Sequence, residues 1–233
     1  MSRFHLLAAT GVSQLPSLNI TLHSPKAPSA SLIIILVLTL LSVAPSLLIL
    51  FTGFAQVVVV LSITRNALGL TAVPPNQVLA GLALFLSIFI MAPTLATVDH
   101  QAVKPYLSGK INAVQAYNRA ESPIKQWMLK NTRTQELALF SSADHTANLP
   151  AASTPMTAVI PAFLLSELHS AFVMGFVIYL PFLIIDLVVS SVLMSLGMMM
   201  LPPTLVSLPF KLLLFVMVNG WSLVVGALLV SMR

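Results

Sequence analysis

The chain has 233 residues, of which 58% are hydrophobic and only 7% are charged, with a formal net charge of +5. A soluble globular domain carries about 25% charged residues, so this chain cannot cover its surface against water and is predicted to be a membrane protein. Its Lys and Arg residues are spread over the sequence, which argues against nucleic-acid binding. The absence of cysteine excludes disulfides, thiolate catalysis and Cys-based metal sites.

The N-terminal segment, residues 1–31, is predicted to be a lead-in or an incomplete signal peptide. Arg3 precedes a short apolar run that polar residues interrupt, whereas the core of a secretory signal has roughly 7–15 apolar residues. Residues 11–30 are rich in Ser and Pro, which indicates a loose connection to the apolar part of the chain.

The first apolar block, residues 32–63, contains no charged residue. One membrane crossing needs roughly 20 residues, so this block is too long for a single straight span. Pro45 or Gly53 is therefore expected to break it into two helical pieces.

The second block, residues 78–98, has the length of one crossing, and Asp99 and His100 are predicted to end it. Together the two blocks predict a first apolar helical hairpin over residues 32–98. Residues 99–155 form a hydrophilic segment whose apolar residues recur at the i, i+4 spacing of a helix. This segment is too small to be a stand-alone enzyme.

The third block, residues 156–200, is about twice as long as one crossing needs. Because Pro161 and Pro181 lie inside it, it is predicted to form a helical hairpin or two broken helices. The fourth block, residues 205–232, is almost wholly apolar. Residues 156–233 are therefore expected to form a second apolar hairpin.

Three charged residues, Glu167, Asp186 and Lys211, lie inside the apolar blocks. An ionised group at the centre of a bilayer costs about 2.5–3.5 kcal/mol on insertion scales, so each needs a partner, water or a place outside lipid. One interpretation is that Lys211 pairs with one of the acids and holds the helices together. The alternatives are a water-lined pathway and an ion pair between subunits, and the sequence does not say which acid meets the lysine.

The stretch LGMMMLPP places Met198, Met199 and Met200 between Gly197 and two prolines. Methionine commonly fills irregular gaps in a core. Three consecutive methionines, however, would point to all faces of a helix, and the prolines prevent a helix from continuing. A second interpretation is a loop of soft side chains. Several copies around an axis would form an apolar collar that blocks ions by dewetting.

The sequence predicts no enzyme, no metal site and no cofactor. Glu167 and His169 lie on different faces of a helix, whereas an H-E-x-x-H zinc site places both histidines on one face. No phosphate-binding loop motif is present, and an intramembrane hydrolase would lack a nucleophile with its base. A small-solute or proton-coupled transporter that uses Glu167 and Asp186 is an alternative of another class.

Two long stretches carry a resemblance to a known family. They are RNALGLTAVPPNQVLAGLALFLSIFIMAPT (residues 65–94) and PAFLLSELHSAFVMGFVIYLPFLIIDLVVSSVLMSLGMMMLPPTLVSLPFKLLLFVMVNGW (residues 161–221). Both resemble the FliP family of flagellar biosynthetic proteins, and the resemblance extends over residues 50–230. The injectisome export gate of virulence secretion is the alternative within the wider family.

The resemblance implies an all-α, multi-pass protein of the bacterial inner membrane that belongs to the flagellar basal body. It implies a type III protein export gate that is built with FliQ and FliR, with this subunit present in about five copies in a helical assembly. Further implied partners are FlhA, FlhB, membrane lipid and the unfolded flagellar subunits that pass through the gate.

The resemblance also implies roles for individual residues. The methionine gasket of the family's channel falls on Met198, Met199 and Met200, and its buried charges fall on Glu167, Asp186 and Lys211. The hydrophilic segment 99–155 corresponds to a part on the periplasmic side, although it carries six of the eleven Lys and Arg residues and the positive-inside rule would favour the cytoplasm.

At three positions the chain departs from the family pattern. Gln56 replaces an arginine, His169 a lysine and Asn219 an aspartate. Roles of those family residues in ion pairs are therefore not carried over to this chain.

Overall fold

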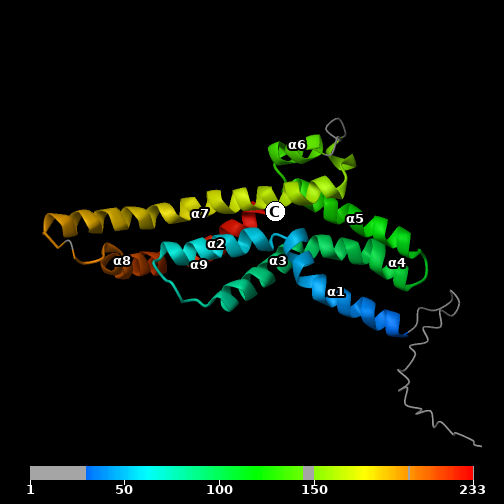
Figure 1. Cartoon of the computed structure of the whole chain (residues 1–233), viewed down its shortest axis with the longest axis horizontal. Helices are drawn as coiled ribbons and strands as arrows, with labels where there is room; N and C mark the ends of the chain where they lie inside the picture. Colours follow the sequence, from blue (N-terminus) through cyan, green and yellow to red (C-terminus); the bar gives the residue numbers. More distant parts are fainter. Residues whose placement is uncertain (1–29, 144–149, 199, 233) are drawn as a thin grey trace, which may run out of the picture. The chain divides into compact units, whose positions relative to one another are not determined.

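The computed structural model describes residues 30–143, 150–198 and 200–232. The chain divides into two units, residues 1–42 and 43–233. Within the described residues all regular secondary structure is helical, which confirms the predicted all-α class. The helices are α1 (Ala30–Phe51), α2 (Phe54–Ala67), α3 (Asn76–Val98), α4 (Lys104–Leu107), α5 (Ala113–Lys130), α6 (Thr134–Ala143), α7 (Met156–Ser195), α8 (Pro203–Met217) and α9 (Gly220–Ser231) (Figure 1).

The first apolar block is broken at one of the two expected places. Helix α1 ends at Phe51 and α2 begins at Phe54, so the break falls at Gly53, while Pro45 lies inside α1. A turn with a cis Val73–Pro74 bond then reverses the chain into α3. Helices α2 and α3 pack against each other as a hairpin.

Helix α3 does not end where the sequence predicted. A π-helical turn, Asp99–Val103, continues it into α4, so that one apolar helix runs from Asn76 to Leu107. Asp99 is neutralised by Lys104 at 2.7 Å between Oδ2 and Nζ. A π turn brings residues five apart together. Asp99 and Lys104 have this spacing, so the two charges pair while the backbone remains helical.

The third apolar block is one unbroken helix, so the predicted hairpin or pair of broken helices within it is wrong. Helix α7 runs for 40 residues with Pro161 and Pro181 inside it and is the long yellow helix of Figure 1. Apolar helices tolerate internal proline where neighbouring groups satisfy the freed carbonyls. The helix that packs against α7 from the following stretch is α8.

Helices α8 and α9 form a bent pair with an angle of 62°. Asn219 causes the bend because it adopts a left-handed conformation with φ of 52°, which asparagine tolerates better than most residues. Its carbonyl oxygen accepts a hydrogen bond from Leu223 N at 3.2 Å, so α9 begins at once.

By length and composition, two of the described helices can cross a membrane, Asn76–Leu107 and Met156–Ser195. The bent pair of α8 and α9 makes a third candidate if it counts as one span. The chain is therefore a membrane protein, as its composition predicted.

Three clusters of buried side chains hold residues 43–233 together. The first joins α2, α3, α7 and α9 around Val60, Leu61 and Leu228. The second joins α3, α5 and α7, where Trp127 and Phe163 have ring centroids 5.2 Å apart. The third joins the end of α2 to α7 and α8. Long-range packing of α7 against the other helices therefore defines the fold.

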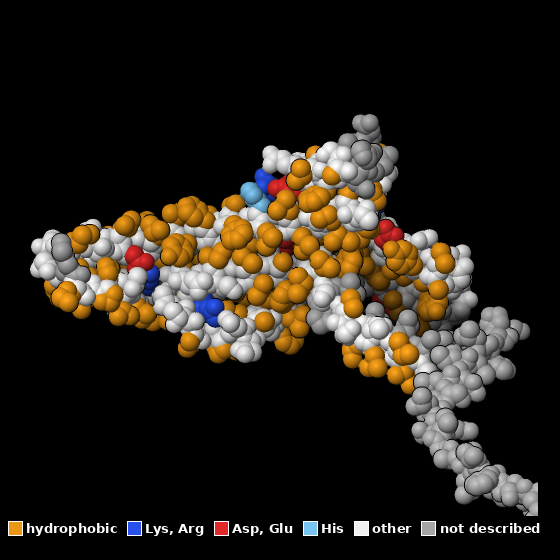
Figure 2. Space-filling view, in the orientation of Figure 1, with side chains coloured by type: hydrophobic (Ala, Val, Ile, Leu, Met, Phe, Trp, Pro, Cys, Tyr) orange, Lys and Arg blue, Asp and Glu red, His pale blue; other side chains and the backbone are white. Residues whose placement is uncertain are grey.

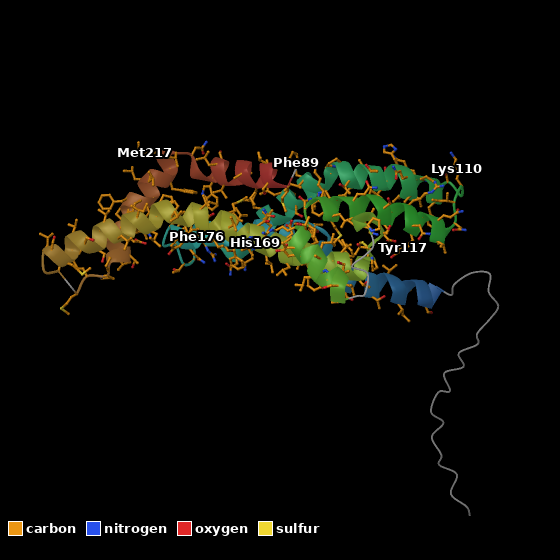
Figure 3. All side chains as sticks on the ribbon, turned by 90° about the horizontal axis from the view of Figure 1, so that it is seen from above. Phe89, Lys110, Tyr117, His169, Phe176 and Met217 are labelled. Carbon is orange, nitrogen blue, oxygen red and sulfur yellow. The ribbon has the colours of Figure 1, made fainter. Side chains whose placement is uncertain are left out.

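The hydrophilic segment forms helices α5 and α6. Asn112 begins α5 with a capping box, in which its side chain accepts from Gln115 N at 2.9 Å and Gln115 Oε1 accepts from Asn112 N at 3.1 Å. Helix α6 packs on α7, and Arg133 N donates to Ser166 Oγ at 3.0 Å. This segment is thus attached to α7 by backbone and side-chain contacts. Figure 3 shows Lys110 and Tyr117 near its α4–α5 turn.

The bend between α8 and α9 requires glycine at position 220. A Cβ atom there would lie 2.2 Å from two ring carbons of Phe215, and this ring is fixed by Trp221 in an edge-on contact of 5.3 Å. Gly220→Ala is expected to destabilise the folded protein by about 1–3 kcal/mol through overpacking. A lower midpoint of thermal unfolding in detergent micelles would show this effect.

Gly226→Ala is the matched control, because a Cβ atom at Gly226 meets nothing within 4 Å. It should unfold at the temperature of the parent protein or above, since alanine favours helix over glycine. Equal midpoints for the two alanine variants would contradict the packing requirement at Gly220.

Candidate functional site

A buried ion pair and an exposed methionine loop lie on the same hairpin of α7 and α8. Lys211 Nζ on α8 lies 2.6 Å from Asp186 Oδ2 on α7. The lysine side chain is 3% exposed and the aspartate side chain 24%. The acid that meets the lysine, which the sequence left open, is therefore Asp186.

Further hydrogen bonds extend this pair to a third helix. Ser207 Oγ on α8 donates to Asp186 Oδ1 at 2.5 Å, so both carboxylate oxygens have a donor. Lys211 Nζ also donates to the carbonyl oxygen of Ala67 at 3.1 Å. Ala67 is the last residue of α2, where carbonyl groups lack helical partners and the helix dipole favours a cation. The network therefore fastens the α7–α8 hairpin to the end of α2.

Sequence reasoning missed Ser207 and the carbonyl group of Ala67. Ser207 lies four residues before Lys211, which places the two side chains on one face of α8, so the sequence did carry a signal for it. The contact with Ala67 joins residues 144 positions apart, and no local pattern indicates it.

Glu167 is not part of this network. It lies 19 residues before Asp186 on the same helix, a separation of about 28 Å along the helix axis. Glu167 is buried, and within the described residues its Oε2 atom has no hydrogen-bond partner. This oxygen lies beside Gly53, at 3.5 Å from where a Cβ atom on that glycine would sit. The structure thus brings together two of the three predicted charges.

The methionine loop follows a specific helix end. Gly197 has a φ of 74°, its N–H donates to Met194 O at 3.1 Å, and Met198 N donates to Leu193 O at 3.0 Å. These two bonds form a Schellman motif, for which glycine in the left-handed region is the usual residue. Glycine thus ends α7 directly before the methionines, and Pro203 begins α8.

The two methionines of this loop that the structure describes are exposed in the chain. Met200 is 99% exposed and Met198 44%, whereas Met199 lies outside the described residues. The interpretation of the methionines as fillers of this chain's own core is wrong for Met200. Helix α7 continues for nine residues beyond Asp186, so the ion pair holds the base of an arm about 14 Å long that carries the loop.

Apolar side chains cover the outer surface of α7 as well. In the most apolar 18-residue stretch of this helix, only 11% of the stretch is buried within the chain. Figure 2 shows hydrophobic side chains in orange along the visible face over α7, with few charged ones. Phe176, which Figure 3 labels, is among the exposed aromatic residues. This surface is suited to lipid or to other subunits.

The three departures from the family pattern occupy different surroundings. Gln56 is buried and donates from Nε2 to Ser231 Oγ at 3.0 Å, which joins α2 to the end of α9. His169 is exposed on α7 (Figure 3). Asn219 is exposed at the bend between α8 and α9. An uncharged side chain thus suffices at the α2–α9 contact.

Comparisons with known proteins identify the family of the chain. The flagellar biosynthetic protein FliP of Bacillus subtilis (strain 168) is 52% identical over 89% of this chain and 94% of its own length. The protein of that name from Aquifex aeolicus (strain VF5) is 47% identical over 86% of this chain and 85% of its own length. The one from Cereibacter sphaeroides is 48% identical over 86% of this chain and 67% of its own length. The model of the FliP family matches residues 37–228, and the chain therefore belongs to the FliP family.

Proposed function

We propose that the protein is a subunit of the export gate of the flagellar type III secretion apparatus, through which unfolded flagellar subunits cross the inner membrane. One observation carries this proposal: Met198 and Met200 are exposed at the end of a hairpin that a buried ion pair fastens to α2. The printed names of the relatives, which are flagellar biosynthetic proteins, support it.

In this proposal the chain does no covalent chemistry and contributes a seal. Methionine side chains are unbranched and flexible, so a collar of them adapts its shape to different passengers. A narrow apolar constriction excludes ions because water leaves it. The rigid arm of α7 and α8 keeps the soft loop at a fixed position along the channel.

The apolar surface of α7 supports an assembly of several subunits. Its 40 residues extend about 60 Å, twice the thickness of about 30 Å of the hydrocarbon core of a bilayer. Lipid alone cannot cover such a helix, so protein neighbours must cover part of it. We assign this role to about five copies of the chain together with FliQ and FliR, with FlhB and FlhA as further partners. The hydrophilic segment 99–155 then faces the periplasm.

The small-solute or proton-coupled transporter is less compatible with the geometry. Such a transporter needs its carboxylates along a water-lined path. Both oxygens of Asp186 already accept hydrogen bonds within the chain, and Glu167 is buried about 28 Å away along α7. The same geometry would also suit a subunit of an injectisome gate, and secretion assays separate these two functions.

A photo-crosslinking side chain at position 200 tests the proposal. With an export substrate stalled in the gate, position 200 is expected to crosslink to the substrate. Val230 is the matched control, because it is exposed on α9 and distant in sequence from the loop, and it should not crosslink. Equal crosslinking at both positions, or none at position 200 in an assembled gate, would contradict the channel role of the loop.

A further inference from the structure

A groove that neither the ion pair nor the methionine loop uses lies between the α2–α3 turn and the bend of α8 and α9. Its volume is about 600 Å³, within the range of about 300–1,000 Å³ that is common for small-molecule sites. Its lining is almost wholly apolar and includes Leu68, Val73, Val78, Phe215, Val216 and Trp221.

Aromatic rings form a firm wall of this groove. Phe215 is buried and meets Trp221 edge-on, with ring centroids 5.3 Å apart. On its other side Phe215 lies against Phe182 of α7, with centroids 6.2 Å apart. Trp221 lines the groove and is half-buried. Tryptophan is enriched at the level of lipid headgroups, where its ring faces apolar matter and its N–H faces polar groups.

A cation lies at the side of the groove. Arg65 Nη1 donates to the carbonyl oxygen of Pro74, a groove residue, at 3.1 Å and to Asn76 Oδ1 at 2.6 Å. Among the described residues Arg65 has no carboxylate partner, and its side chain is half-buried, with an Nε–H that is itself buried and has no acceptor there. Asn76 is the first residue of a candidate membrane helix. The hydrogen bond to Asn76 therefore places the guanidinium group beside the first residue of a helix that is long and apolar enough to cross a membrane.

We propose that this groove binds an anionic phospholipid, with an acyl chain along the apolar wall and the phosphate group on Arg65. A guanidinium group matches phosphate oxygens in shape as well as in charge. Basic side chains beside the ends of membrane helices bind anionic headgroups. A zwitterionic lipid satisfies the apolar wall equally well but carries a second, positive charge near the arginine.

Fluorescence of Trp221 tests the proposal in the full-length chain. The chain has two tryptophans, and Trp127→Phe leaves Trp221 as the single reporter while keeping an aromatic ring against Phe163. This protein is placed in vesicles of phosphatidylcholine with brominated chains, which quench nearby tryptophan. An unbrominated lipid that displaces the brominated one from the groove restores the fluorescence. Phosphatidylglycerol should do so about tenfold more effectively than phosphatidylcholine, as expected for one charge-assisted contact.

Two pairs of variants separate the headgroup contact from the acyl-chain contact. Arg65→Gln should abolish the preference for phosphatidylglycerol, while Lys110→Gln, which changes an exposed cation at the α4–α5 turn (Figure 3), should keep it. Val216→Phe should fill the groove, weaken quenching by brominated phosphatidylcholine and reduce the effect of both unbrominated lipids. Val230→Phe should not, although Val216 and Val230 are similarly exposed, at 74% and 76%.

Equal effects of the two lipids on the parent protein, or a preference that survives Arg65→Gln, would overturn the assignment of the phosphate site. If Val216→Phe leaves the quenching unchanged, the assignment of the groove is overturned. This test keeps Arg65 and its hydrogen bonds to Pro74 and Asn76 in the α2–α3 turn. If quenching occurs in the isolated chain but not in the assembled gate, the assignment of the groove to a lipid is overturned, and the groove is a contact with a protein partner.

Discussion

Asp186→Ala is expected to abolish most of the assembly of this chain with the FliQ-like and FliR-like partners that we propose, and to do so more strongly than Lys211→Ala. The reason is the difference in burial within the pair. Without Asp186, the buried Lys211 ammonium keeps, among the described residues, only the carbonyl oxygen of Ala67 as an acceptor. Removing one partner of a buried pair costs about 3–5 kcal/mol. Without Lys211, the aspartate is still 24% exposed and still accepts from Ser207.

Co-purification of the partner subunits and thermal unfolding of the purified chain together measure this effect. The double variant Asp186→Leu with Lys211→Met should assemble better than Asp186→Ala alone, because no charge is left unpaired. Asp99→Ala is the control, since its pair with Lys104 is exposed at the surface and worth about 0–1 kcal/mol. Normal assembly of Asp186→Ala, or equal effects of the substitutions at positions 99 and 186, would contradict the role of the ion pair in fastening the α7–α8 hairpin to α2.

Replacing Met198, Met199 and Met200 with alanine is expected to let small ions leak through an overproduced gate. Each alanine removes most of a long apolar side chain, so the collar that we propose would widen enough to stay wet. Ion flux from vesicles that contain the purified complex measures the leak. Replacement with leucine should restore the seal, because leucine keeps the apolar volume. The leucine side chain is less flexible than that of methionine and adapts less to different passengers.

Met217→Ala controls for the loss of methionine as such. Met217 is exposed at the end of α8, outside the loop (Figure 3), and its replacement should leave the ion flux unchanged. If the triple alanine variant assembles normally and its ion flux equals that of the parent, the methionine loop is not a seal.

The sequence predicted that the apolar stretches are helical and that the first of them breaks near Gly53. The end of α7 before Met198 follows from a local backbone preference that a sequence displays, because Gly197 adopts the left-handed conformation. The number of helices in residues 156–200 was predicted wrongly because proline breaks helices in water, where nothing else restores the lost hydrogen bond. In an apolar helix, neighbouring groups restore it, and α7 continues through Pro161 and Pro181.

The candidate site was predicted in its parts but not in its connections. A charged residue in an apolar run indicates a special environment, which identified Asp186 and Lys211. The choice of Asp186 over Glu167, and the contact of Lys211 with Ala67, depend on how α2, α7 and α8 pack. Packing depends on residues far apart in the sequence, and patterns of local spacing do not contain it.

A clean deletion of the gene, examined by electron microscopy beside a complemented strain, is the most direct test of the flagellar export function. The deleted cells are expected to lack hooks and filaments, because both are built from subunits that must pass through the gate, and the complemented cells should regain them. Normal hooks and filaments on the deleted cells would contradict the assignment.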